Sequence, residues 1–257
     1  MGSPAMFTAV TGASAQQVRI DVIANNLANL GTTGFKAQRP SFEDLLYENV
    51  RPPAAENDSP TGLQFGRGSR VVATERQFSP GTIRQTEQPL DLAIDGRGFL
   101  AVTQLDGSTG YTRDGSLRLD VNGNIVTHEG LQLEPPVTVP TDSLEILITQ
   151  QGEVQARSPG SNTLSTVGNI QLYSFPNQTG LIALGGNLYQ ETESSGTATA
   201  STPGEDGVGR LLQGSLEEAN VNIAEELVNL ILAQRAFEAN TRVISTSDEI
   251  LRFVTQR

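Results

Sequence analysis

The two ends of the chain carry hydrophobic residues at helical spacing, and the middle carries them at strand spacing. In residues 4–30, one stripe of side chains recurs at alternating steps of four and three, which is the core pattern of a heptad repeat. Ser3 and Pro4 suit the start of a helix, and Gly31 suits its end. The N-terminal stripe consists of Met6, Val10, Ala13, Gln17, Ile20, Ala24 and Leu27.

The last forty residues repeat this pattern. Asn222 and Glu225 have the spacing of a capping box, and neither Gly nor Pro interrupts residues 215–257. The predicted helix is roughly 50 Å long. We therefore expect the two terminal helices to pair as an intramolecular coiled coil and to leave surface for neighbours. The C-terminal stripe consists of Ile223, Leu227, Leu230, Gln234, Phe237, Thr241, Ile244, Asp248 and Leu251.

The middle of the chain alternates with period two, as β-strands do. Residues 117–121 alternate apolar and polar side chains, and Asn122-Gly123-Asn124 then leads into residues 125–127, which is a strong hairpin signal. We expect a second hairpin between residues 144–149 and 154–156. Further strands are expected at residues 99–103, 111–113 and 170–175, with polar, poorly structured stretches at residues 51–62 and 193–209.

These patterns predict an α+β fold, in which terminal helices pair as a coiled coil next to a β-rich middle domain and an extended connecting segment. The expected N-terminal coiled-coil helix covers residues 1–30, and the connecting segment covers residues 31–72. The β-rich domain covers residues 73–215, and the C-terminal coiled-coil helix covers residues 216–257.

The charge distribution excludes some partners. The formal net charge is −12, and residues 52–218 hold nine basic and twenty acidic groups, a net of −11. Nucleic acids and anionic membrane surfaces require clustered Lys and Arg, so we expect neither as a partner. The ends are almost neutral and could pack against copies of themselves without strong repulsion.

Candidate chemistry is sparse. His128 is the only histidine and lies beside a predicted hairpin, so it predicts neither a zinc site nor a catalytic triad. Asp91 and Asp95 could act as a carboxylate pair in glycoside cleavage, but the chain contains no Trp, and a turn and a strand edge explain both residues. Residues 120–124 resemble the start of a calcium loop, yet Leu131 stands where that loop needs Glu. We predict no catalytic, cofactor or metal site.

Cysteine is absent, which excludes disulfides, thiolate metal sites and a cysteine nucleophile. The N-terminus shows no basic and apolar pattern of a signal peptide, and no run approaches the roughly 20 apolar residues of a membrane span. We expect no membrane insertion. If the protein leaves the cytoplasm, we expect an export route without a cleavable signal peptide.

Several short motifs resemble the bacterial flagellar rod and hook family. They occur in the family's order and span nearly the whole chain, at residues 21–29, 32–36, 93–100, 111–115, 220–229 and 234–240. Each motif is short, but together they are specific. The terminal motif residues are Asn25, Asn26, Asn29, Gly34, Phe35, Asn220, Asn222, Glu225 and Glu226.

The resemblance implies a structural subunit that polymerises helically and is not an enzyme. It implies that the terminal helices form an inner coiled-coil tube, with the two heptad stripes as self-assembly surfaces, and that the β-rich domain forms the outer wall. It also implies that residues 31–72 stiffen the shaft. The implied partners are copies of the chain, other rod proteins, hook-side proteins, the type III export apparatus and, in Gram-negative bacteria, the P and L rings.

Within the family, residues 42–47, 62–66 and 73–76, together with room for only one β domain, favour a subunit of the distal rod in the basal body. A proximal rod or hook subunit is the nearest alternative. A secreted β-rich carbohydrate enzyme built on Asp91 and Asp95 is a remote alternative from another class, and a generic adhesin or coiled-coil interaction module is a third.

Overall fold

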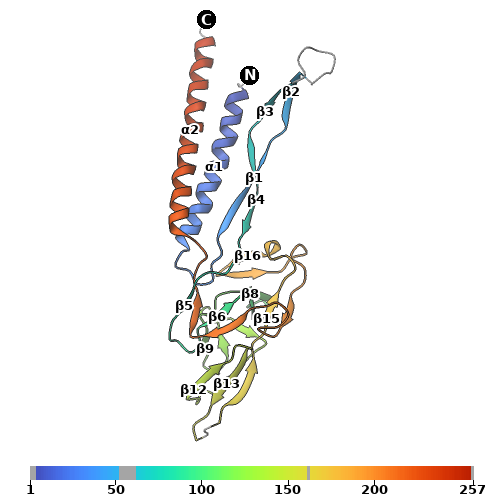
Figure 1. The fold of residues 1–257 in the computed structure, drawn as a ribbon, viewed down its shortest axis with the longest axis vertical. Helices are drawn as coiled ribbons and strands as arrows, with labels where there is room; N and C mark the ends of the chain where they lie inside the picture. Colours follow the sequence, from blue (N-terminus) through green and yellow to red (C-terminus); the bar gives the residue numbers. More distant parts are fainter. Residues whose placement is uncertain (1–3, 52–61, 161–162, 256–257) are drawn as a thin grey trace. The chain divides into compact units, whose positions relative to one another are not determined.

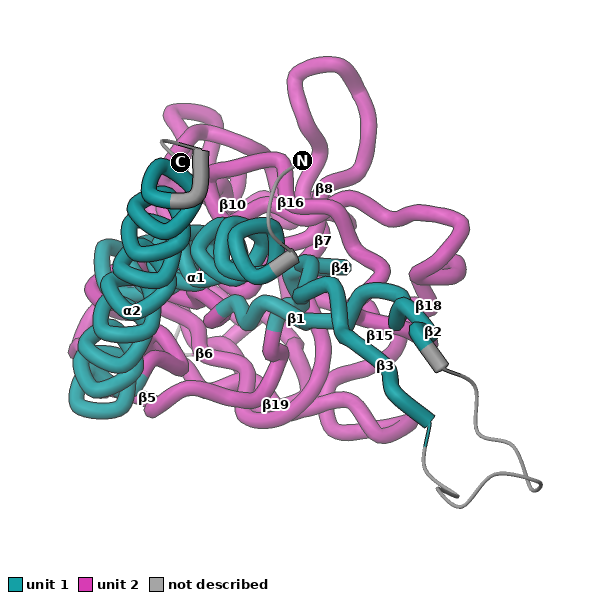
Figure 2. The backbone as a smooth tube through the Cα atoms, turned by 90° about the horizontal axis from the view of Figure 1, so that it is seen from above, with its two compact units in different colours: residues 1–28, 38–76, 222–257 teal, residues 29–37, 77–221 magenta. Residues whose placement is uncertain are grey.

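The computed structural model describes residues 4–51, 62–160 and 163–255, and the chain divides into two compact units (Figures 1 and 2). Unit 1 consists of residues 1–28, 38–76 and 222–257, and unit 2 of residues 29–37 and 77–221. The chain therefore passes between the units four times. The predicted α+β class is confirmed, because a helix lies at each end of a β-rich middle.

Two helices dominate unit 1. Helix α1 (Pro4–Ala28) packs against α2 (Ile223–Thr255), as Figure 1 shows. Asn222 caps α2, since its Oδ1 accepts hydrogen bonds from the backbone N–H groups of Ala224 (3.1 Å) and Glu225 (3.4 Å). The predicted helix start at this residue is confirmed. Among the described residues, no helix is both long and apolar enough to cross a membrane.

Two pairs of antiparallel strands complete unit 1. β1 (Gln38–Asp44) pairs with β4 (Ser69–Arg76), with a shift in register between Ser41 and Phe42. β2 (Tyr47–Arg51) pairs with β3 (Leu63–Gly66) farther along the same two chain segments. Most of the loop predicted at residues 51–62 lies outside the described residues.

Unit 2 is built around a seven-stranded antiparallel sheet, with strand order β16-β17-β8-β7-β11-β10-β9. Its strands are β7 (Leu100–Thr103), β8 (Thr109–Thr112), β9 (Arg118–Leu119), β10 (Ile125–Val126), β11 (Gln132–Glu134), β16 (Ile182–Gly185) and β17 (Leu188–Gln190). A smaller sheet contains β12 (Glu145–Ile148), β13 (Glu153–Arg157) and β14 (Ser165–Asn169). The remaining elements are the pairs β5 (Ile83–Gln85) with β20 (Ser215–Glu217), β6 (Leu92–Asp95) with β19 (Arg210–Gln213) and β15 (Leu172–Ser174) with β18 (Thr199–Ser201), and the short 3-10 helix η1 (Gln178–Gly180).

Both predicted hairpins are confirmed. Ile125 pairs with Leu119 across the Asn-Gly turn, and Ile148 pairs with Val154 in the second hairpin. The expectation of a loop throughout residues 193–209 is wrong in one part, because β18 pairs there with β15. Residues 199–201 read Thr-Ala-Ser, whose small polar side chains gave no strand signal although their backbone completes the pair.

Both hydrophobic core clusters of the described chain lie in unit 2. One cluster gathers aliphatic side chains from several strands, among them Leu92, Leu100 and Leu211, each about 1% exposed. A second cluster is aromatic, and Phe99 stands at its centre with edge-to-face contacts to neighbouring rings. No cluster of this kind includes a described residue of unit 1.

Candidate assembly surface

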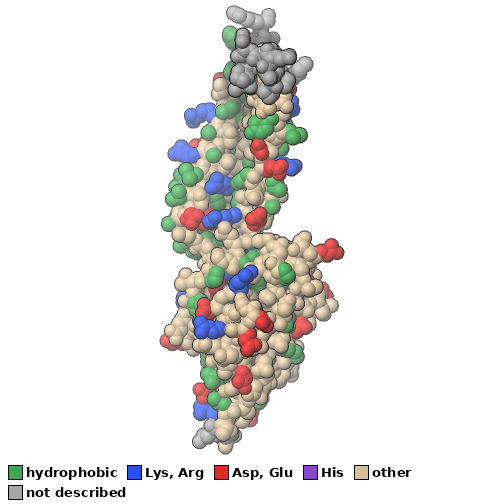
Figure 3. Space-filling model, turned by 45° about the vertical axis from the view of Figure 1, so that its right-hand side comes forward, with side chains coloured by type: hydrophobic (Ala, Val, Ile, Leu, Met, Phe, Trp, Pro, Cys, Tyr) green, Lys and Arg blue, Asp and Glu red, His purple; other side chains and the backbone are tan. Residues whose placement is uncertain are grey.

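The outer face of α2 is strongly apolar. Large side chains on its first three turns are exposed to solvent; Ile223, for example, is 47% exposed and Leu232 is 57% exposed. Ala233 is the only described residue of the helix that is buried. Figure 3 shows hydrophobic side chains at the surface along the helices. A soluble monomer rarely exposes a patch of this kind unless the patch binds a partner. The exposed apolar residues of α2 are Ile223, Leu227, Val228, Ile231, Leu232, Val243, Ile250 and Phe253.

Helix α1 and the strands of unit 1 add to this surface. Phe7 and Val10 of α1 are 53% and 46% exposed. The strands pack closely on α1, because Gly68 lies so near Thr11 that a Cβ there would overlap the threonine hydroxyl. Even so, their own large side chains stay exposed. These are Phe42, Leu46, Tyr47, Val50, Leu63, Phe65 and Val72, of which Leu46 lies in the connection between β1 and β2.

Polar side chains fix the arrangement of unit 1 from within. Asn26 is 1% exposed and binds the backbone of Gln38 twice: its Oδ1 accepts from the amide N–H, and its Nδ2 donates to the carbonyl, both at 2.9 Å. Its Nδ2 also donates to Glu226 of α2 at 3.0 Å. One buried amide thus links α1, β1 and α2. Arg39 and Glu225 form a further, exposed ion pair at 3.3 Å.

A buried ion network holds the crossing segments within unit 2. Glu217 accepts from Lys36 Nζ at 2.7 Å and from Arg113 Nε at 2.8 Å, and all three side chains are at most 1% exposed. Its carboxylate also accepts from the Gly81 N–H at 2.8 Å. Arg113 donates to backbone carbonyls including those of Gly96 and Gly98. These bonds compensate charges that would otherwise be costly to bury.

The pKa values of this network reflect its burial. Loss of water around the ammonium and the nearby Arg113 charge lower the pKa of Lys36 to about 8, although Glu217 acts in the opposite direction. Burial alone would raise the pKa of Glu217. The charges and hydrogen bonds of Arg113 and Lys36 outweigh that effect, so the pKa of Glu217 lies below its ordinary value.

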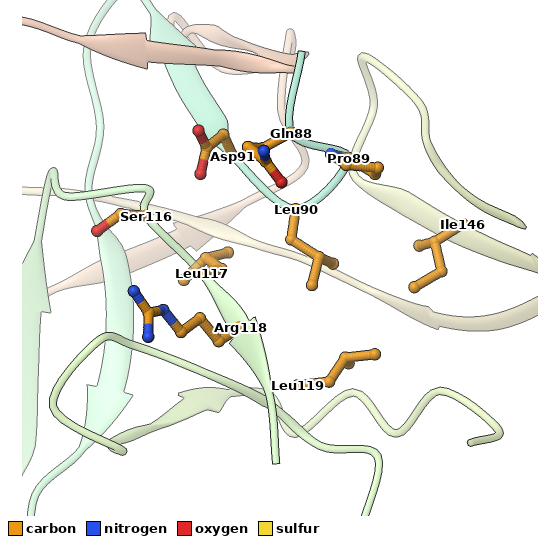
Figure 4. A pocket seen from close by; sticks show the side chains of 9 residues that line it. All are labelled: Gln88, Pro89, Leu90, Asp91, Ser116, Leu117, Arg118, Leu119 and Ile146. Carbon is orange, nitrogen blue, oxygen red and sulfur yellow. The ribbon is translucent and has the colours of Figure 1, made fainter. Parts of the chain in front are cut away.

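The carboxylates of the enzyme alternative are not brought together. Asp91 lines a hollow of about 490 Å³, in which Leu90, Leu119 and Ile146 converge while its carboxylate points away from them (Figure 4). That carboxylate accepts from Thr86 Oγ1 at 2.5 Å. Asp95 does not line this hollow, and it lies 4.0 Å from Arg210 in an exposed ion pair. Within the described ranges, no group of three His, Cys, Asp or Glu residues could hold a metal ion.

Comparison with known proteins gives a consistent result. Family models match residues 6–36 (flagella basal body rod protein), residues 93–156 (flagellar hook protein FlgE/F/G D1 domain) and residues 212–257 (flagellar basal body rod FlgEFG protein C-terminal). The chain is 43% identical to the flagellar basal-body rod protein FlgG of Caulobacter vibrioides, over 98% of both chains. It belongs to the flagellar basal-body rod protein family.

Two further relatives support the same family assignment. The chain is 44% identical to the flagellar basal-body rod protein FlgG of Borreliella burgdorferi over 96% of both chains. Identity falls to 32% with the flagellar basal-body rod protein FlgF of Escherichia coli, over 95% of this chain and 94% of that protein. The chain is accordingly a structural protein of the flagellar basal body that assembles into a rod with other flagellar components, and it is not an enzyme.

The rod-family motif residues lie where the chain passes between the units. Gly34 has φ +69°, and a Cβ there would lie 2.8 Å from the Arg113 carbonyl group, so only glycine fits. Phe35 is 6% exposed, and its carbonyl accepts from the Asn220 N–H at 3.4 Å. The Asn220 side chain in turn accepts from the Ala37 N–H and donates to the Gln77 carbonyl, both at 2.7 Å.

The other motif residues lie at the helix ends. Asn29 follows α1, and its Oδ1 accepts from Thr32 Oγ1 at 3.2 Å in the turn that leaves the helix. Asn25 is exposed on the last turn of α1. Asn222 supplies the N-cap of α2 described above, and Glu225 and Glu226 in its first turn bind Arg39 and Asn26. The motif residues of the rod family therefore mostly fix the backbone.

In the single chain, the predicted heptad stripes coincide only partly with the buried faces of α1 and α2. On α2, Leu230, Phe237, Ile244 and Leu251 are partly buried, whereas Ile223, Leu227 and Gln234 are exposed. On α1, only Ala13 of the stripe is buried; Met6, Ile20 and Leu27 are partly buried, and Val10, Gln17 and Ala24 are exposed. The role of the stripes in assembly stays a prediction.

Sequence reasoning missed the ion network entirely. Lys36 is the only lysine of the chain, and nothing in its local sequence marks it as buried. Its partner Glu217 lies 181 residues away, and Arg113 lies 104 residues from Glu217. The one available signal was that Lys36 and Arg113 both lie inside motifs of the rod family.

Proposed function

We propose that the chain is a subunit of the distal part of the flagellar rod, where copies polymerise helically into a rigid, hollow drive shaft that transmits torque to the hook. The observation that carries this proposal is the apolar surface of unit 1. It exposes large hydrophobic side chains from Ile223 to Phe253 of α2, near the start of α1 and on the strands, and contributes no residue to either core cluster. Burying that surface against copies of itself would drive an ordered polymer.

The terminal helices are the proposed inner assembly elements. In this proposal α1 and α2 pair as a coiled coil and line the inner tube, within the predicted ranges 1–30 and 216–257. Of the second range, residues 216–221 belong to unit 2, and α2 begins at Ile223. The contact between the two helices supports the pairing. The exposed members of the heptad stripes, such as Val10 and Leu227, would contact neighbouring subunits, while partly buried members such as Phe237 and Ile244 would hold the pair together.

The rest of the chain would form the wall of the shaft. Residues 31–72 are proposed as the connecting region that stiffens it, and residues 73–215 as the β-rich outer domain. The antiparallel pairing of β1 with β4 supports a stiff connection, because a paired ribbon bends less readily than a single extended segment.

Partners follow from this location. We expect other copies of the chain, proximal rod proteins, hook-side proteins and, in Gram-negative bacteria, the P and L ring proteins around the shaft. Export through the flagellar type III apparatus would deliver the subunit to the growing rod. The acidic balance of the middle supports the expectation that neither nucleic acid nor a membrane surface is a partner.

A proximal rod or hook subunit is the alternative. Identity to relatives named FlgG, at 43% and 44% in the two cases above, exceeds the 32% identity to FlgF and favours the distal rod. The test is an in-frame deletion of the gene, followed by imaging of purified hook–basal bodies beside the parent. We expect truncated rods without the distal shaft and hook. Intact rods without a hook would assign the chain to the hook, and normal flagella would refute both.

A substitution pair tests the assembly surface itself. Ile231→Asp places a charge in the apolar patch of α2, and we expect the deletion strain to stay without distal rods when it carries this variant. Arg235→Gln is the matched control, because its side chain is 78% exposed on the same helix but polar. Both purified variants should unfold at the parent's urea midpoint. Normal rods with Ile231→Asp would show that this patch is not an assembly surface.

A further inference from the structure

One long stretch of unit 2 carries no charge. Unit 2 as a whole holds seven basic and seventeen acidic side chains, a net charge of −10. Between Arg157 and Glu191, however, residues 158–190 contain no Asp, Glu, Lys, Arg or His. Every copy of the chain carries the same acidic unit, so contacts between copies are least opposed by repulsion where charge is absent.

The uncharged stretch contains an open edge of the main sheet. Strand β16 is the last strand of the seven-stranded order and pairs on one side only, with β17. All four of its residues are exposed, and Ile182 and Leu184 are 55% and 46% exposed. Soluble proteins usually protect such an edge with Lys, Pro or inward charges. The sequence of β16, Ile-Ala-Leu-Gly, contains none of these, although its pairing with β17 is irregular between Ala183 and Gly185.

The other edge of the same sheet offers matching chemistry. Strand β9 ends the order on that side, and its Leu119 is 38% exposed. Val121, just beyond it in the Asn-Gly hairpin, is 88% exposed.

We infer that the β16 edge of one copy binds the β9 edge of another copy within the rod. This inference rests on the proposed function, because it needs a polymer of this chain. The two edges differ, so their contact is heterologous and can repeat without closing, as an open helical polymer requires. A contact of β16 with β16 would instead close into a two-fold dimer and end growth.

Disulfide cross-linking tests this contact, because the chain contains no cysteine of its own. The full-length chain with Ile182→Cys and Val121→Cys is expressed in the deletion strain, and its rods are mildly oxidised. On a non-reducing gel we expect a ladder of multiples of the 27.4 kDa chain. Each single variant should stay monomeric. The pair Ile182→Cys with Leu105→Cys is the control, since Leu105 is fully exposed but lies in the turn between β7 and β8.

Three outcomes would overturn the inference. The double variant could build rods yet stay monomeric, Ile182→Cys alone could form a dimer, or the cross-linked product could contain a different protein. In each case rods still form, so the proposed function is unaffected. Normal rods in a strain without this gene would instead refute that function. Should the first pair fail to build rods, Leu184→Cys with Leu119→Cys tests the same edges, and a ladder or its absence decides in the same way.

Discussion

Phe99 in unit 2 and Leu232 in unit 1 are both large hydrophobic side chains, but the first is fully buried and the second is 57% exposed. The same contrast runs through the two units. Unit 2 gathers its aliphatic and aromatic residues into two clusters, whereas unit 1 spreads its own along helices and strands. Unit 2 is stabilised from within a single chain, whereas unit 1 leaves large hydrophobic side chains exposed, which we propose other subunits bury. Burial within one chain therefore does not measure how much hydrophobic surface a subunit finally buries.

The largest expected effect comes from the ion network of unit 2. Glu217→Ala would leave Lys36 and Arg113 buried without their counter-charge. We expect the free energy of unfolding to fall by about 3–5 kcal/mol. Urea unfolding followed by tyrosine fluorescence reports on this unit, because the chain has no Trp and three of its four tyrosines lie in or against the aromatic cluster.

A neighbouring residue provides the control for this substitution. Glu218 forms an exposed ion pair with Arg84 at 2.9 Å, so Glu218→Ala should change the free energy of unfolding by at most about 0.5 kcal/mol. Equal losses in the two variants would show that the buried network gives unit 2 no special stability.

A matched pair of leucines compares the units directly. Leu92→Ala opens a cavity in the core of unit 2, and we expect it to cost about 2–5 kcal/mol. Leu232→Ala removes an exposed side chain of unit 1 and should cost at most about 0.5 kcal/mol in the monomer. Rods in the deletion strain should respond mainly to the second change. A strongly destabilised Leu232→Ala monomer would contradict the contrast between the units.

A smaller effect is expected inside unit 1. Asn26→Ala removes the amide that binds the backbone of Gln38 and the side chain of Glu226, at a cost of about 1–3 kcal/mol. Hydrogen exchange at the Gln38 amide would measure the local opening. Gln17→Ala is the control, since Gln17 is exposed and bonds only along its helix to Asp21, where a few tenths of a kcal/mol are expected. An unchanged exchange rate of the Gln38 amide would show that the Asn26 side chain does not hold this backbone in place.

The smallest expected effect is the change in stability of unit 2 as the pH falls from about 7 to 4. Only the beginning of the Glu217 titration lies in this range. The pKa of Glu217 is lower in the folded chain than its ordinary 4.5, so its stabilising effect is present above that value and is lost as the pH falls through the native pKa. The difference in unfolding free energy between the parent and Glu217→Gln should therefore shrink on acidification. A constant difference would refute this assignment.

Lys36 acts in a separate pH window. Its pKa falls from 10.5 to about 8 on folding, so between these values the unfolded chain holds more protons than the folded one. As far as Lys36 is concerned, stability rises with pH through that window. In the parent, this window lies above the pH range of the acid experiment.

The elements with local signals were predictable. The heptad spacing located both helices, and Asn122-Gly123-Asn124 located a hairpin, because each signal lies within a few neighbouring residues. The buried face of α1 was less predictable. Ala and other small residues occur all around this helix, so its apolar stripe is weak, and the residues buried most deeply include Ala9, Ala15 and Ile23, which lie off the predicted stripe.

Contacts between distant segments could not be predicted from one sequence. The pairing of β1 with β4 joins segments on either side of a 24-residue gap between Asp44 and Ser69, and the Glu217 network joins three parts of unit 2. A pattern shows that a segment is a strand or that a residue is charged, but not which distant partner it meets. The family motifs marked these residues without giving the physical reason for them.

The burial of the only lysine also determines how the folded subunit meets chemical reagents. Lys36 is 0% exposed, so a folded subunit offers no side-chain amine to an acylating dye or an amine-directed cross-linker. Trypsin, which cuts after Lys and Arg, could cleave after Lys36 only once unit 2 has unfolded. The extent of Lys36 acylation would then measure how often unit 2 unfolds, without any engineered label.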